Sequence, residues 1–208
     1  MSTPALVEEP RGMLGSLDVI YRRRAVRAYK PDAIDERRLR ALFDAAVHAP
    51  TAMHQEPWQF VVVQDRQLLK RLSDRAKAMA RGQATHHGTL LKPPGAAGNG
   101  IPTPLADPAF NIFYDAGTLV VICARPTNEF VAADCWLAAE NFMLAASASG
   151  LGTCCIGFAV HALNSPEVKA ELGIPADVHA FAPMIVGVPR GDPLPVSRKP
   201  PVVLNWLR

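Results

Sequence analysis

Apolar residues recur along the chain with two different spacings, which predicts a mixture of helices and strands. A spacing of three or four positions predicts helices over 17–24, 36–49, from Asp65 onward, 134–149 and 166–172. Short runs rich in β-branched residues predict buried strands over 60–64, 118–123, 153–158 and 182–188. Residues that favour helix N-caps precede three of the helices, at Ser16, at Asp35 and at either Asn164 or Ser165.

The segment 134–149 is apolar on almost every side. Its polar residues are Asp134, Glu140, Asn141, Ser147 and Ser149. A helix with so little polar surface is typically buried, either in the core of its own chain or against another copy of that chain.

Two stretches break the periodic pattern. Residues 1–15 contain two prolines and two glycines and predict a mobile N-terminal tail. Residues 82–109 hold prolines and glycines in quick succession. A stretch this long without periodicity is typically either disordered or a lid over a site.

The composition is that of a soluble globular protein, with 49% hydrophobic and 20% charged residues. A net charge of +3 favours capture of an anionic ligand but does not indicate a nucleic-acid partner. The four cysteines form no CxxC pair and no metal-ligand spacing with histidine, so we interpret them as core residues in a reducing compartment. No secretory signal or membrane span is apparent, which predicts a cytoplasmic protein without membrane contact.

Residues 49–60 form the most unusual connection in the sequence. Pro50 and Pro57 fix the backbone at both ends of a loop that carries polar side chains beside Trp58. Such a stiffened loop can hold a ligand, although a plain link between a helix and a strand would also fit the pattern.

Four arginines are candidates for phosphate binding, at positions 23, 24, 27 and 198. Guanidinium groups bind phosphate through paired hydrogen bonds, and three of them within five residues would suit a terminal phosphate. The alternative is a solvated basic face.

The stretch 150–158, Gly-Leu-Gly-Thr-Cys-Cys-Ile-Gly-Phe, is the third candidate. Glycines let a backbone approach a flat ligand closely, and a strand edge presents N–H groups to ring atoms. A glycine helix cap followed by a core strand would also fit. Because no hydrolase or phosphoryl-transfer motif is present, an enzyme with these features would depend on a bound cofactor.

Taken together, four motifs in this order and spacing resemble the FMN-dependent nitroreductase family. They are Arg-Arg-Ala-Val-Arg-Ala-Tyr-Lys-Pro at 23–31, Ala-Pro-Thr-Ala-Met-His-Gln-Glu-Pro-Trp-Gln-Phe at 49–60, Gly-Leu-Gly-Thr-Cys-Cys-Ile-Gly at 150–157, and Gly-Val-Pro at 187–189 with Arg198. The resemblance covers residues 16–200. It implies an α+β fold in which helices wrap a mostly antiparallel sheet, with 16–208 as one FMN-binding domain in an intertwined homodimer.

The resemblance also assigns site residues. It implies that Arg23, Arg24, Ala25, Arg27 and Arg198 surround the phosphate and ribityl chain of FMN. It implies that Pro50, Thr51, Ala52 and His54 of the partner subunit line the isoalloxazine ring. The backbone of Cys155, Ile156 and Gly157 would face the same ring, with one N–H bonded to its N5 atom.

The sequence departs from the family pattern at four positions within these motifs. Ala25 and Thr51 stand where serine is usual, His54 where asparagine is usual, and Glu56 where glutamine is usual. The last two changes place titratable groups near the flavin, so substrate preference cannot be copied from other members.

The resemblance implies an oxidoreductase that passes hydride from NAD(P)H through FMN to a nitroaromatic, a quinone or a similar small acceptor. The alternatives on this fold are a reductive dehalogenase, a flavin-modifying oxygenase and a non-catalytic FMN-binding protein. A basic nucleic-acid-binding module is the rival from another class.

Overall fold

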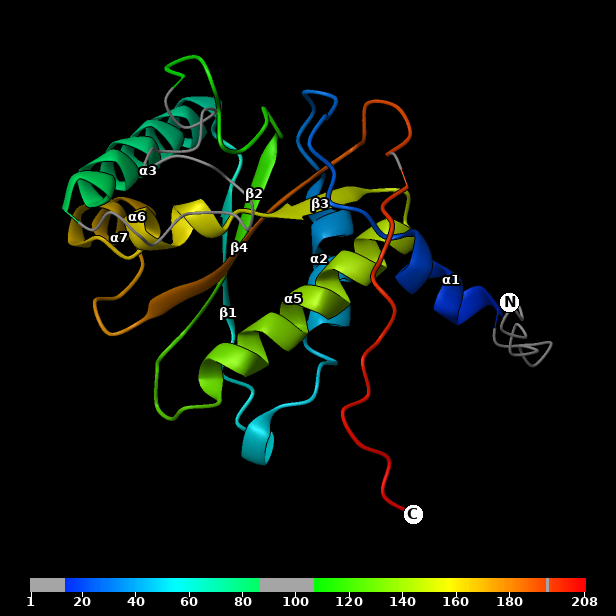
Figure 1. Ribbon diagram of the computed structural model, residues 1–208. Helices are drawn as coiled ribbons and strands as arrows, with labels where there is room; N and C mark the ends of the chain where they lie inside the picture. The colour runs from blue at the N-terminus through cyan, green and yellow to red at the C-terminus, as the bar shows by residue number, and fades with distance from the viewer. Residues whose placement is uncertain (1–13, 87–106, 194) are drawn as a thin grey trace.

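The computed structural model describes residues 14–86, 107–193 and 195–208 (Figure 1). The helices are α1 (Leu14–Arg22), α2 (Glu36–Ala46), α3 (Arg66–His86), α5 (Val131–Ala148), α6 (Val160–Leu163) and α7 (Pro166–Leu172). Two single 3-10 turns are η1 (Ala52–His54) and η2 (Gly157–Ala159). The strands are β1 (Gln59–Val63), β2 (Thr118–Ala124), β3 (Gly152–Cys155) and β4 (His179–Gly187).

The four strands form one antiparallel sheet in the order β1-β2-β4-β3. Gln59 of β1 pairs with Cys123 of β2, and Cys155 of β3 pairs with Met184 of β4. The register shifts once, between Ile122 and Cys123. The order leaves β1 and β3 as the two edge strands of the sheet.

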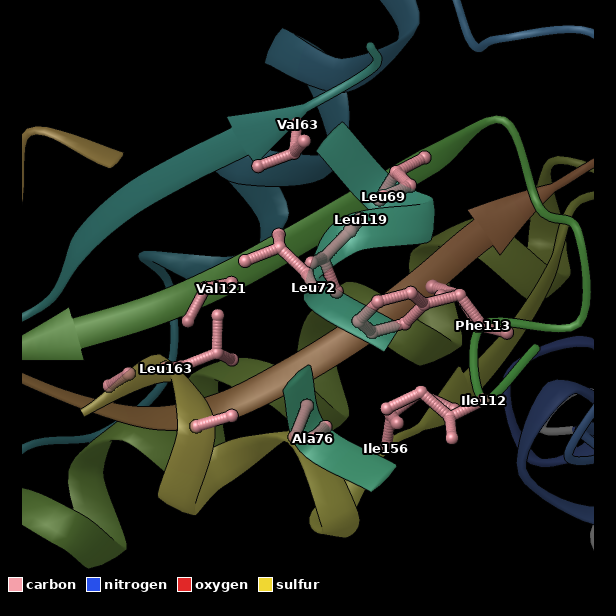
Figure 2. Packing of buried hydrophobic residues seen from close by; sticks show 14 of the residues in the cluster. Val63, Leu69, Leu72, Ala76, Ile112, Phe113, Leu119, Val121, Ile156 and Leu163 are labelled. Atoms are coloured by element: carbon pink, nitrogen blue, oxygen red, sulfur yellow. The ribbon is translucent and has the colours of Figure 1, made fainter. Parts of the chain in front are cut away.

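The sheet separates two apolar cores. Alternate residues of β2 point to opposite faces, with Leu119 and Val121 on one side and Val120 and Ile122 on the other. Helices α3, α6 and α7 cover the first face, where Phe113 is fully buried (Figure 2). Helices α2 and α5 cover the second face. The chain is therefore an α+β sandwich, as predicted.

All predicted helices and strands are present, but several boundaries differ. Helix α1 begins at Leu14, so Ser16 lies inside it, and α2 ends at Ala46 rather than 49. The predicted strand 153–158 runs only from Gly152 to Cys155, because the chain then turns into η2. Helix α5 begins three residues earlier than predicted, β4 spans 179–187, and the short helix α6 was not predicted.

The structure describes only part of the two aperiodic stretches. Helix α1 takes in residues 14 and 15 of the predicted tail, and residues 1–13 lie outside the described residues. A break in the helical pattern was predicted from Gly82, but helix α3 continues to His86. One glycine within a helix costs only about 1 kcal/mol, which is too little to end it. Residues 107–109 are described as part of a turn, and the remainder of the predicted lid, 87–106, lies outside the described residues.

The cysteines are free thiols, as predicted, and burial raises the pKa of both Cys123 and Cys135 to about 12. An unfolded thiol ionises from about pH 9, so the unfolded chain binds fewer protons than the folded one above that pH. Stability contributed by the buried thiols is therefore complete below pH 9 and is lost as the pH rises towards 12. We expect a loss of about 1 kcal/mol per thiol by pH 10.

Urea unfolding at pH 8 and pH 10 measures this loss. The double variant Cys123→Ala, Cys135→Ala should lose less unfolding free energy between the two pH values than the wild type. Equal losses in both proteins would show that these thiols do not contribute.

Candidate functional site

The predicted phosphate segment lies along the outer edge of β3. Ala25 forms a parallel bridge with Thr153, and the Val26 N–H donates to the Thr153 carbonyl at 2.9 Å. Gly152 permits this approach, because a Cβ there would lie 2.6 Å from the Val26 side chain. This glycine therefore serves protein packing, whereas the sequence alone suggested an approach to a ligand.

Two of the predicted guanidinium groups gather at this edge. Arg23 is mostly buried and forms an ion pair with Glu140 of α5 at 3.5 Å between Nε and Oε1. Burial raises the pKa of Cys154, while the charges of Arg27 and Arg23 lower it, so both guanidinium groups lie near β3. Arg27 also lies over the ring of Tyr114, 6.0 Å from its centroid. Two guanidinium groups and the carboxylate of Glu140 therefore lie near the edge of β3.

Arg24 and Arg198 are placed differently from the other two. The Arg24 guanidinium donates to the carbonyls of Tyr21 and Arg23, so it stabilises the C-terminal end of α1. Arg198 lies on the exposed C-terminal segment after β4. Its place beside the other arginines stays a prediction.

Of the predicted ring-binding residues 155–157, Cys155 is the one whose backbone N–H faces the outer edge of β3. The Ile156 N–H donates instead to the Pro183 carbonyl at 2.9 Å and is therefore not available to a ligand. In an antiparallel pair, successive residues point their backbone groups to opposite sides, so Thr153 and Cys155 both face away from β4. Thr153 bonds the Val26 segment, which leaves the Cys155 N–H on the open part of the edge. A Cβ at Gly157 would meet no atom within 4 Å, so the space in front of it is open.

The second predicted half of the site, the loop 50–57, has a strained backbone. Met53, His54 and Glu56 have positive φ angles of 54°, 53° and 45°. Non-glycine residues rarely adopt this conformation, and clusters of them are typical of functional sites. The side chains of Met53, His54 and Glu56 are exposed, while Pro57 and Trp58 are half-buried.

The loop is held by the segment 127–134, which leads into α5. The Ala52 N–H donates to Oδ1 of Asp134 at 3.1 Å. Gln55 Oε1 accepts from Asn128 at 3.2 Å and from the Thr127 hydroxyl at 3.4 Å. The Ala52 carbonyl accepts from the Gln55 N–H, so both backbone groups of Ala52 are engaged within the chain. Its methyl group forms no hydrogen bond and is suited to contact an apolar ligand.

The two halves lie at diagonally opposite corners of the sheet. The loop enters β1 at Gln59, whereas the arginine segment lines β3 at the other edge (Figure 1). Three strand spacings separate the edges, about 14 Å. Along the strands, Gln59 is level with Ala180 and Cys155 with Met184, a further separation of about 13 Å. A single chain therefore does not bring its two halves together.

Three residues near the candidate site were not singled out as site residues from the sequence. Asp134 bonds the loop, Glu140 pairs with Arg23, and Tyr114 lies under Arg27 with a positive φ of 52°. The signal for the first two was present in the sequence, because they are the two acidic residues of a largely apolar helix. Nothing in the local pattern marks Tyr114.

In the described ranges, no cluster of three or more histidine, cysteine, aspartate or glutamate residues could hold a metal ion. In those same ranges no helix combines the length and the apolar character needed to cross a membrane.

Comparisons with known proteins agree with the resemblance. A 29% identical relative is the nitroreductase NfnB of Mycolicibacterium smegmatis, aligned over 84% of each chain. A provisionally named NADH dehydrogenase/NAD(P)H nitroreductase of Archaeoglobus fulgidus is 28% identical and aligns over 85% of this chain and 86% of its own length.

Solved structures also include similar nitroreductases. One of them, with bound FMN, from Bacteroides fragilis, superposes with a TM-score of 0.74 at 26% identity, over 92% of this chain and 97% of that one. The family model described as the nitroreductase family matches residues 20–188, most of the chain. This protein therefore belongs to the nitroreductase family of oxidoreductases.

Proposed function

We propose that this protein binds FMN and transfers hydride from NAD(P)H through it to a small oxidised acceptor such as a nitroaromatic or a quinone. The observation that carries the proposal is the outer edge of β3, where two guanidinium groups and one open backbone N–H line a single strand. When bound, FMN supplies the hydride-accepting and hydride-donating ring. FMN in the Bacteroides fragilis relative and the NAD(P)H in the name of the Archaeoglobus fulgidus relative support both cofactors.

The residues at this edge fit an anionic, flat cofactor. Arg23 and Arg27 would hold the phosphate, with Arg198 joining them from the C-terminal segment. Ala25 contributes backbone only, since it has no hydroxyl. Arg24 would act indirectly, because its guanidinium caps α1. The open Cys155 N–H is the donor that would meet N5 of the ring, and Gly157 leaves room for the ring itself.

The opposite corner of the sheet would serve the site of a second copy. Pro50, Thr51, Ala52 and His54 would line the partner's ring, because they lie too far from the arginines of their own chain. The methyl group of Ala52 is suited to packing on a flat apolar surface. This arrangement makes the homodimer part of the site.

Exposed apolar side chains support a dimer independently. On α5, Trp136 and Leu137 are 41% and 44% exposed, so the predicted all-round burial of this helix is not met within one chain. The C-terminal segment exposes a larger group, namely Val202, Val203, Leu204, Trp206 and Leu207. Apolar surface of this extent on a soluble protein is typical of an interface, and a second copy would cover it.

The alternatives on the same fold gain no specific support. An iodotyrosine deiodinase bound to FMN and 3-iodo-L-tyrosine superposes with a TM-score of 0.69, over 91% of this chain and 98% of its own. At 20% identity this likeness shows the fold alone. The dehalogenase alternative therefore rests on the fold and on no residue of this chain.

An absorption spectrum of the purified protein tests the proposal. We expect flavin bands that bleach when NADH or NADPH is added without oxygen and return when a nitroaromatic or quinone is added. Flavin bands that neither nucleotide bleaches would indicate a non-catalytic FMN-binding protein. Absence of flavin, together with failure to bind added FMN, would contradict the proposal.

His54 provides a test of what this chain adds to the family pattern. Its side chain is exposed on the strained loop. An imidazole, unlike the amide of asparagine, can carry a positive charge, and a positive charge near the ring would stabilise the reduced, anionic flavin. We therefore expect the midpoint potential of the wild type to exceed that of His54→Asn by about 20 mV or more at acidic pH and by less at alkaline pH.

Spectroelectrochemical titration of both proteins between pH 5 and 9 measures this difference. His54→Gln is a second neutral variant and should behave like His54→Asn. Superimposable curves for all three proteins would mean that His54 has no electrostatic role at the flavin.

A further inference from the structure

Asp134 is an exception within its helix. It is 3% exposed, while the other buried residues of α5 are apolar: Val131, Cys135, Ala138, Ala139, Phe142, Met143 and Ala146. A buried carboxylate is costly unless it is paired or fully hydrogen-bonded. Here Oδ1 accepts from the Ala52 N–H, and Oδ2 is buried with no hydrogen-bond partner in the described part of the chain. Folding alone does not favour this residue at this position.

Capping of α5 does not explain Asp134 either. The N-cap position belongs to Phe130, and the Asp134 N–H already donates to the Phe130 carbonyl within the helix. The carboxylate is instead directed away from its own helix, to a backbone N–H 82 positions earlier in the chain. The positive end of the helix dipole stabilises a charge at this first turn by about 1–2 kcal/mol at most, which is less than the several kcal/mol that burying a carboxylate costs.

The partner of Asp134 is the start of the strained loop. Ala52 is the first residue of η1, and the three residues with positive φ follow at 53, 54 and 56. Strain of this kind persists only where surrounding contacts hold the backbone. Thr51 gives no such support, because its side chain makes no capping hydrogen bond to η1. Among the side-chain hydrogen bonds that hold the loop, the one to Asp134 is part-buried and its acceptor is a carboxylate, whereas those from Thr127 and Asn128 are exposed.

We propose that Asp134 is a positioning residue that holds the loop 51–56 in the conformation in which it contacts the flavin of the partner subunit. The proposal rests on the proposed function, since the flavin gives the loop its task. Asp134 itself does not touch the cofactor. It acts through the Ala52 N–H, which donates to its Oδ1.

Three variants separate this role from ordinary core stability. Asp134→Ala removes the acceptor for the Ala52 N–H. Asp134→Asn keeps an acceptor oxygen in nearly the same place. It chiefly replaces Oδ2, the atom that has no hydrogen-bond partner. Cys135→Ala is the matched control, because it truncates the next, fully buried residue of α5 and leaves the loop contact intact.

Hydrogen exchange of the Ala52 amide in the purified protein is the first measurement. We expect exchange at least about tenfold faster in Asp134→Ala, and within about threefold of wild type in Asp134→Asn and Cys135→Ala. The dissociation constant of FMN should follow the same order. An unchanged Ala52 exchange rate in Asp134→Ala would overturn the proposal, and so would equal effects of all three variants.

The FMN measurement also separates this proposal from the one on which it rests. Wild-type protein that binds no FMN would contradict the proposed function itself. Wild-type protein that binds FMN, with an unchanged affinity in Asp134→Ala, would contradict only the role of Asp134.

Discussion

Arg23→Ala is expected to weaken FMN binding by roughly tenfold to a hundredfold. A hydrogen bond between a guanidinium and a phosphate contributes about 1.5–3 kcal/mol, and Arg23 is mostly buried, so solvent screens it little. Removal of Arg23 also leaves Glu140 without its partner at the edge of β3. An unpaired carboxylate near the phosphate would add repulsion to the lost attraction. Fluorescence titration of cofactor-free protein with FMN measures the effect.

Neighbouring arginines supply the controls for this result. Arg22→Ala removes an exposed guanidinium that pairs with Asp18 on α1, and it should leave FMN affinity unchanged. Arg198→Ala should weaken binding if the C-terminal segment reaches the phosphate. If Arg23→Ala and Arg198→Ala both retain wild-type affinity, the phosphate does not lie at this edge.

Mixing two variants that each bind FMN weakly is expected to restore sites that bind FMN with wild-type affinity. Arg23→Ala damages the β3 corner, and Ala52→Trp places a bulky ring where the loop would meet the flavin. If each site combines the β3 corner of one copy with the loop of the other, a mixed dimer contains one intact site and one doubly damaged site. Random pairing of equal amounts should therefore restore about a quarter of all sites.

A site built from one chain alone predicts the opposite result. In that case each site of a mixed dimer would carry one of the two substitutions, and no site would recover. Each variant refolded alone is the control, and bound FMN per chain is the measurement. Light scattering on the wild type adds an independent check, because a monomer that retains FMN would contradict a shared site.

Local signals in the sequence predicted the elements well. Asp35 caps α2 through a hydrogen bond to the Arg38 N–H, and Ser165 caps α7 ahead of Pro166, as the pattern indicated. These features depend on contacts between residues three or four positions apart, which the order of residues displays directly. The strand that was predicted too long, 153–158, ended early because the Ile156 N–H is the last to reach β4, at Pro183. The end of β3 is therefore set by its pairing with β4, which is distant in the sequence.

The sequence predicted which kinds of chemical group are available for a site, and it did not predict how those groups are arranged. The sequence by itself determined the family, the order of the elements and the groups available, which are arginines, a stiffened loop and a glycine-containing strand. Only the tertiary structure decided that Arg24 caps a helix, that Cys155 carries the open N–H and that Asp134 anchors Ala52. These facts depend on strand order and register and on pairs such as 52 and 134. Because such pairs are far apart in the chain, packing of the whole domain sets them and no local pattern encodes them.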